Sequence, residues 1–366
     1  MAKVILLSQF PLPYSKIGSW TTMYKNYLES DHKIDYIICE PPESRFKNVS
    51  YEIVESTFLM KVRRRILKYY RIGFIDALKK IISENNDEKF IIQLVDNFKI
   101  VPRINQMLKE NGWRKNCYIQ IFYHGFPPFI VAEKYDNFHE SIDELVLLTN
   151  DSYKAHKLYY SVFPCKISIL YNGIDTKKFH IADTATKDKL KSDSGYAGKK
   201  VFLWCSQNRP KKGLHLIIDV WKRVYPLHSD IVLLVVGANS NTAVQGVFFT
   251  GEVPNDDLPQ YYRMADCYLF PTLCHEGFPL SLTEALNCGC YCIASNYGGV
   301  PEVLQYGKYG RIIENPNYVS EWEAAINNYL SGAEQPIHLS SPIYTVEDWI
   351  ANMNVIINNA KTSLGI

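Results

Sequence analysis

Two glutamates eight residues apart mark the stretch of this 366-residue chain whose residue types best fit sugar chemistry. Glu276 falls in a loop after a predicted strand, and Glu284 falls in the helix predicted to follow that loop. Gly277 lets the backbone approach a ligand closely, and the amides at the start of the helix offer donors to an anion. Carboxylate oxygens accept hydrogen bonds from the hydroxyls of a sugar or a ribose. The stretch therefore predicts, in outline, a pocket for a nucleotide sugar.

The elements expected to position these residues follow a β-loop-α rhythm. The apolar run 4–7, a loop with two prolines, and a helical pattern over 20–28 open the chain as a Rossmann-like domain does. Strands alternate with helical stretches and the rhythm restarts after residue 200, which favours two parallel sheets. The expected strands are 4–7, 34–39, 90–95, 118–123, 145–149, 166–171, 201–205, 231–236, 247–250 and 267–270.

Composition limits the class of protein. A hydrophobic fraction of 47% and a charged fraction of 21% are typical of soluble globular proteins and argue against disorder. Forty basic and 38 acidic residues leave a net charge of +2, too balanced to indicate a nucleic-acid partner. No apolar run approaches the length of a membrane span, and nine scattered cysteines fit a reducing compartment. We therefore expect a cytoplasmic protein that does not bind nucleic acid.

Three cysteines alternate at Cys288, Cys290 and Cys292 and leave two readings open. They could ligate a metal, or they could be small apolar residues on one face of a strand. A spacing of two residues is not that of a zinc site, so we favour the strand.

The string from His275 to Leu286 resembles the donor motif of glycosyltransferase family 4, because it combines Glu-x7-Glu with Gly-Phe-Pro and Glu-Ala. Other segments resemble that family in the same order along the chain. They are Tyr171–Asp175, Lys211–Gly213, Phe249–Gly251, Leu258 with Tyr261, Ala265–Asp266, and Gly298–Glu302.

The resemblance implies an α/β protein of the GT-B fold, with two facing Rossmann-like domains and a deep interdomain cleft that holds the active site. It divides the chain into an acceptor-side domain over 1–172, a donor-binding domain over 173–345, and a C-terminal segment over 346–366. The amphipathic helical pattern of that last segment is expected to pack back on the first domain.

The same resemblance implies the roles of the residues in the donor motif. Glu284 would bind the donor ribose, and Glu276 would contact the hydroxyls of the donor sugar near the reacting face. The backbone between them would line the sugar and the diphosphate. The residues concerned are Gly277, Phe278, Pro279, Leu280 and Ser281.

Positive charge for the diphosphate is implied at Lys212, and also at Arg209, because charge develops on the leaving group as the glycosidic bond breaks. The family's arginine position is occupied here by Gln207, so Arg209 is either its replacement or a solvated surface charge. The resemblance places Gly18 and Ser19 in a loop that closes over the phosphates, although such a glycine is also an ordinary turn residue. It directs His124 at the transfer site, against the alternative of a structural histidine.

The predicted activity is retaining transfer of a hexose-type sugar from a nucleoside diphosphate to a hydroxyl of a glycan or lipid-linked acceptor, in cell-surface polysaccharide biosynthesis. No cofactor or metal is expected beyond the nucleotide-sugar donor, because the chain lacks an Asp-x-Asp element. The alternatives are a GT-B epimerase or phosphorylase, and a non-catalytic sugar-nucleotide-binding subunit. The donor base, the sugar, the acceptor and the linkage stay open.

A basic amphipathic stretch over 61–71 carries no acid. Such a stretch can lie on anionic lipid, and the alternatives are an ordinary solvated helix face and a pocket for an anionic acceptor. We favour peripheral contact with the inner face of the membrane. The cations are Lys61, Arg63, Arg64, Arg65, Lys68 and Arg71.

Overall fold

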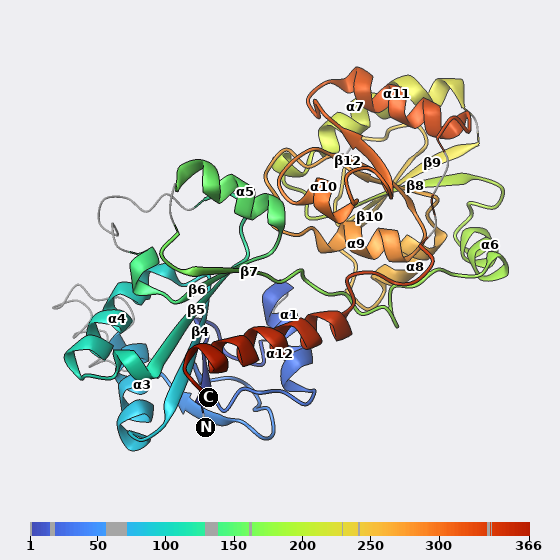
Figure 1. Cartoon of the computed structure of the whole chain (residues 1–366). Coiled ribbons are helices and arrows are strands. Elements are labelled where there is room, and N and C mark those ends of the chain that lie inside the picture. Colours follow the sequence, from blue (N-terminus) through green and yellow to red (C-terminus); the bar gives the residue numbers. More distant parts are fainter. Residues whose placement is uncertain are drawn as a thin grey trace. The chain divides into compact units, whose positions relative to one another are not determined.

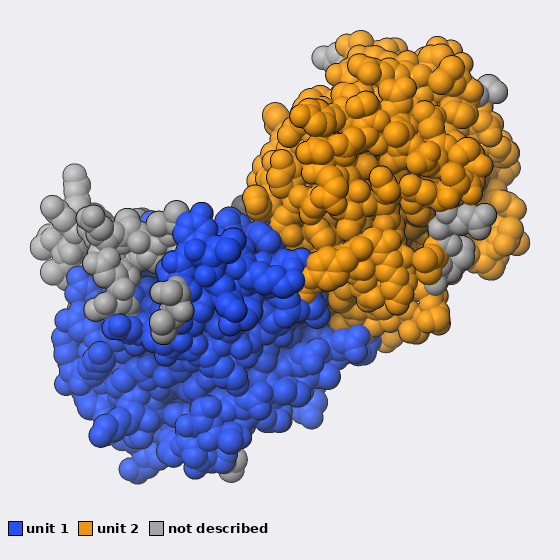
Figure 2. Space-filling model, turned by 45° about the horizontal axis from the view of Figure 1, so that its top comes forward, with its two compact units in different colours: residues 1–172, 346–366 blue, residues 173–345 orange. Residues whose placement is uncertain are grey.

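The computed structural model describes residues 2–14, 19–55, 72–128, 138–160, 163–228, 230–240, 242–334, 337 and 339–366. The chain forms two compact units, which Figure 2 distinguishes by colour. Unit 1 comprises residues 1–172 and 346–366, and unit 2 comprises residues 173–345.

Unit 1 is built on a seven-stranded parallel sheet with the order β3-β2-β1-β4-β5-β6-β7 (Figure 1). The central strands are buried and mostly apolar, as expected of a parallel sheet that is covered on both faces. The strand β3 was not predicted, because it is a half-exposed edge strand without an apolar run. The strands are β1 (Ala2–Leu7), β2 (Tyr36–Cys39), β3 (Ser50–Ile53), β4 (Lys89–Val95), β5 (Cys117–Tyr123), β6 (Glu144–Leu147) and β7 (Lys166–Ile169).

Helices cover both faces of this sheet. Alternate residues of β1 enter opposite cores, with Val4 in the core beneath α1 and α12 and Ile5 in the core beneath α3 and α4. The terminal helix α12 belongs to the first core, where the Trp349 ring lies 5.7 Å from Tyr24 and 5.8 Å from Tyr27 between centroids. The helices are α1 (Ser19–Leu28), α3 (Ile72–Glu84), α4 (Val101–Glu110), α5 (Asn150–Tyr159) and α12 (Val346–Ser363).

Unit 2 repeats the plan with a six-stranded parallel sheet in the order β10-β9-β8-β11-β12-β13. Phe202, Trp221 and Trp322 fill a core on one face of the sheet. The strands are β8 (Lys200–Cys205), β9 (Ile231–Val236), β10 (Val247–Gly251), β11 (Cys267–Phe270), β12 (Tyr291–Ser295) and β13 (Gly310–Ile313). The helices are α6 (Thr184–Asp193), α7 (Leu214–Val224), α8 (Leu258–Met264), α9 (Leu280–Asn287), α10 (Val300–Val303) and α11 (Val319–Leu330).

The two parallel sheets confirm the predicted α/β class, and the alternating cysteines require a correction. Only Cys292 lies in β12, whereas Cys288 follows the last residue of α9 and Cys290 precedes the strand. All three are buried free thiols, so they behave as small apolar core residues in the turn that joins helix to strand. Within the described ranges, no group of three or more histidine, cysteine or acidic side chains is arranged to hold a metal ion.

None of the helices in the described residues has the length and the apolar character needed to cross a bilayer.

Candidate active site

A glycine brings Lys212 to the loop after β11. Lys212 ends the 3-10 turn Pro210–Lys212, and Gly213 follows with φ of +72°. A Cβ atom on Gly213 would lie 1.9 Å from the carbonyl oxygen of Pro271, so only glycine permits this approach. The Leu273 amide then donates to the Lys211 carbonyl at 2.8 Å. The turn after β8 is thereby held against the loop that carries Glu276.

The Glu276 carboxylate contacts polar side chains from its own loop and from the turn after β8. Its Oε1 lies 2.5 Å from the Lys212 ammonium nitrogen and 3.0 Å from the hydroxyl oxygen of Thr272. The Cys274 thiol donates to the same oxygen at 3.7 Å. The Lys212 and Glu276 side chains are only 21% and 18% exposed, so their ion pair is partly shielded from water.

The backbone of Glu276 is fixed as firmly as its side chain. Glu276 pairs with Gly298 in an isolated parallel bridge, and its carbonyl accepts from the Gly299 amide at 2.8 Å. A Cβ atom on Gly298, whose φ is +66°, would lie 2.4 Å from the Glu276 carbonyl oxygen. The glycine loop after β12 is therefore a structural support for the carboxylate.

The start of α9 offers hydrogen-bond donors beside this carboxylate. Pro279 is the N-cap residue, and no side chain caps the helix. The amides of the first turn of a helix have no partner within the helix, and they favour an anion. Phe278 anchors the approach to the helix, since its buried ring packs edge-on against Tyr344 at 5.2 Å between centroids.

Glu284 lies one turn further along α9, in an environment that disfavours its charge. Burial raises its pKa to about 7, and the neighbouring Tyr262 hydroxyl opposes that shift. A carboxyl group in this state can accept a hydrogen bond from a diol when ionised and can donate one when protonated.

Arg209 stands apart from the Lys212–Glu276 pair. It is the N-cap residue of the 3-10 turn, with an exposed side chain. That side chain makes no ion pair or hydrogen bond with any part of the chain that the structure describes. Its role as a replacement for the arginine of the family stays a prediction.

In unit 1, His124 follows β5 and faces an acid that was not predicted. The His124 amide donates to Asp96 Oδ1 at 2.8 Å, and the ring Nδ1 lies 3.6 Å from Asp96 Oδ2. Asp96 follows β4 with φ of +50°, at the carboxyl end of the neighbouring parallel strand. An acid directly after a buried strand was the signal in the sequence, because such strand ends meet at one edge of a sheet.

The remaining predicted residues are described only in part. Gly18 lies outside the described residues, and Ser19 is described only as the first residue of α1. The basic stretch 61–71 also lies outside them. Nothing in the structure therefore bears on the predicted phosphate loop of unit 1 or on the predicted membrane contact.

Solved structures share this fold along nearly the whole chain. The structure of HepE from Anabaena in complex with UDP-glucose superposes with a TM-score of 0.69 at 15% identity, over 98% of this chain and 100% of that one. The two α/β units therefore make a GT-B fold.

The sequence of unit 2 is similar to that of a known family. Residues 186–343 match the model described as glycosyl transferases group 1. Spore coat protein SA of Bacillus subtilis is 26% identical over 46% of this chain and 51% of its own length. A GDP-mannose-dependent phosphatidylinositol monomannoside mannosyltransferase of Mycolicibacterium smegmatis is 26% identical over 39% of this chain and 41% of its own. The chain spans about half the length of these relatives or less. Unit 2 is thus similar in sequence to the glycosyl transferases group 1 family.

Proposed function

We propose that this chain is a retaining glycosyltransferase that moves a hexose-type sugar from a nucleoside diphosphate to a hydroxyl of a glycan or lipid-linked acceptor. The observation that carries the proposal is the half-buried Lys212–Glu276 pair beside the uncapped start of α9. The family match and the UDP-glucose bound to HepE support a nucleotide sugar as the donor.

Each group around the pair has a task in the transfer. The donor diphosphate would bind to Lys212 and to the amides at the start of α9. Their positive potential would stabilise the charge that develops on the leaving group. Glu276, released from Lys212, would bind hydroxyls of the sugar, and Glu284 would bind the ribose. Two sources of positive potential then surround the diphosphate, so we propose that no metal is needed.

His124 would act from unit 1 on the donor sugar. The contact with Asp96 would hold the ring in one orientation and favour the tautomer with a proton on Nδ1. Asp96 is therefore a positioning residue in this proposal, whereas His124 touches the sugar. Retention would follow from attack on the face from which the diphosphate leaves.

The setting of the reaction is a proposal of the same kind. The relative from Mycolicibacterium is named for a phosphatidylinositol mannoside acceptor, and a lipid-bound acceptor would suit an enzyme at the cytoplasmic face of a membrane. A role in cell-surface polysaccharide biosynthesis is consistent with such an acceptor.

A panel of uridine, guanosine and adenosine diphosphate sugars tests the function. We expect one of them to raise the melting temperature of the protein and to be hydrolysed slowly when no acceptor is present, because water can replace the acceptor hydroxyl. Both effects should persist in EDTA. Stabilisation by none of the donors would contradict a nucleotide-sugar site, and a loss in EDTA that magnesium restores would contradict the metal-free diphosphate site.

A further inference from the structure

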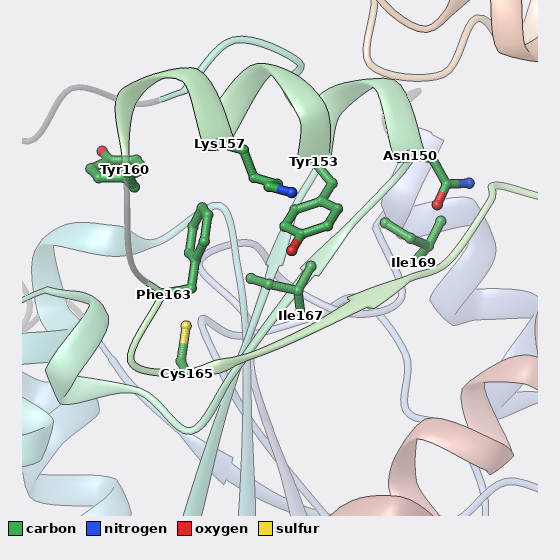
Figure 3. Close-up of a pocket in the computed structure, with 8 residues that line it drawn as sticks. All are labelled: Asn150, Tyr153, Lys157, Tyr160, Phe163, Cys165, Ile167 and Ile169. Atoms are coloured by element: carbon green, nitrogen blue, oxygen red, sulfur yellow. The ribbon is translucent and has the colours of Figure 1, made fainter.

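A groove that none of these roles uses lies in unit 1, between α5 and the edge strand β7 (Figure 3). Its volume is about 530 Å³. Residues spaced as one face of a helix line it from α5 and its C-cap, and alternate residues line it from β7 and the segment before β7. Those from the helix are Asn150, Tyr153, Lys157 and Tyr160, and those from the strand side are Phe163, Cys165, Ile167 and Ile169.

The lining changes character along the groove. Asn150 and Ile169 lie at one end in Figure 3, Lys157 and Ile167 lie in the middle, and the aromatic rings of Tyr160 and Phe163 lie at the other end. Ile167 and Ile169 are only half-buried, although they face the helix. A helix that simply covered its sheet would bury those side chains, so apolar surface is left for another molecule.

Lys157 supplies a single positive charge to this lining. Its ammonium nitrogen lies 5.5 Å from the centroid of the Tyr153 ring, and the groove is lined by no carboxylate among the described residues. Lys157 forms no ion pair with any described side chain, whereas Lys154 on the same helix pairs with Asp151 at 2.8 Å. Lys157 is therefore available to an anion.

The two ends of the groove differ in what lies beside them. Ile169 is in register with Leu147, and Leu147 with Tyr123, the residue before His124. Two strand spacings separate Ile169 from Tyr123. The Ile169 end of the groove therefore lies about 10 Å from the strand end that carries His124. Because α5 runs away from that edge, its last turn lies towards the other end, where Leu158 is 86% exposed and Tyr159 is 62% exposed. Exposed tyrosine and leucine beside lysines are typical of a surface that meets a membrane.

We propose that this groove binds a phosphate-linked lipid acceptor, with its polar head at the Asn150 end and its phosphate on Lys157. The apolar chain lies against Phe163 and Ile167 and leaves the protein beside Leu158 and Tyr159. The order of polar head, anion and apolar chain in such a lipid matches the order of the lining. The assignment rests on the proposed function, because it makes the groove the acceptor site of the transfer.

Calorimetry with simple amphiphiles tests the groove without any donor. Dodecyl phosphate, below its micelle concentration, should bind the full chain, and the affinity should rise about fourfold for each methylene that is added between butyl and dodecyl phosphate. Inorganic phosphate and dodecyl maltoside should bind at least tenfold more weakly. Equal affinity for inorganic phosphate would reduce the site to an anion site, and equal affinity for dodecyl maltoside would show that Lys157 is not used. Either result would overturn the proposal.

Lys157→Glu should weaken the binding of dodecyl phosphate at least tenfold, because an attraction becomes a repulsion. Lys154→Glu changes the same charge on the same helix, away from the lining, and should leave the affinity unchanged. Both positions are exposed, and equal melting temperatures would show that both variants fold. Equal loss in the two variants, or no loss in Lys157→Glu, would contradict the groove.

The groove and the transferase function can fail separately. A chain that binds a nucleotide sugar but not dodecyl phosphate would overturn only the lipid groove. A chain that binds dodecyl phosphate but no nucleotide sugar would overturn the transferase function, and with it the assignment of the groove as an acceptor site.

Discussion

The loop of unit 2 that carries Glu276 and the groove of unit 1 are built in opposite ways. Glu276 is held by a lysine, a hydroxyl, a thiol and its own backbone before any ligand arrives. The groove has half-buried apolar walls and the cation of Lys157, which forms no ion pair with the side chains that the structure describes. A preorganised polar site suits a ligand part that recurs in every turnover, such as a diphosphate, whereas an adaptable apolar wall suits a chain without fixed shape. In the proposed function, the loop around Glu276 would recognise its ligand by geometry, and the groove would recognise its ligand by burial.

The largest expected effect on turnover comes from removing the positive charge of Lys212. Lys212→Ala should lower kcat by about 100- to 1000-fold, because the charge of Lys212 is needed most when the diphosphate separates. Lys211→Ala is the matched control, since the Lys211 side chain is exposed and only its carbonyl takes part in the loop. Steady-state transfer with the best donor measures both variants. Similar rates for the two would remove Lys212 from the site.

A second effect concerns stability and pH. The pKa of Glu284 is raised by burial to about 7, so the folded protein binds a proton that the unfolded chain releases near its ordinary value. The ligand-free protein should lose stability as the pH rises from about 4.5 to 7, by up to about 3 kcal/mol. Glu284→Gln should remove this loss and unfold at higher urea than wild type at pH 8, with little difference near pH 4.5. If the free energy of unfolding depended on pH in the same way in both proteins, Glu284 would not titrate in this range.

A smaller effect is expected from the hydroxyl that orients Glu276. Thr272→Val keeps the shape of the buried side chain and removes its hydrogen bond to Oε1, so kcat should fall about 3- to 10-fold. Nucleotide affinity should stay constant, because Thr272 does not touch the nucleotide in the proposed site. Thr272→Ser should restore the rate. A loss of kcat that serine does not restore would point to packing instead.

These comparisons also show how much the sequence could predict. The sheets were predictable because buried parallel strands are continuous apolar runs, and the half-exposed β3 was missed for the same reason. Glu276 and Lys212 could be singled out as candidates because each lies in a short contiguous motif, but the contacts of Thr272 and Cys274 depend on how the loop closes. The groove could not be predicted from the sequence. Residues 150, 153, 157 and 160 look like an ordinary helix face, and a gap between a helix and its sheet leaves no trace in periodicity.

In the proposed function, unit 2 holds the donor around Glu276 and Glu284. Calorimetric titration of wild type and Glu284→Ala with the cognate nucleoside diphosphate, in EDTA, tests it most directly. We predict that wild type binds without metal and that the variant binds about 1 to 3 kcal/mol more weakly, because a hydrogen bond to the ribose is lost. Equal affinity of the two proteins would contradict the ribose site and the proposed donor site around it.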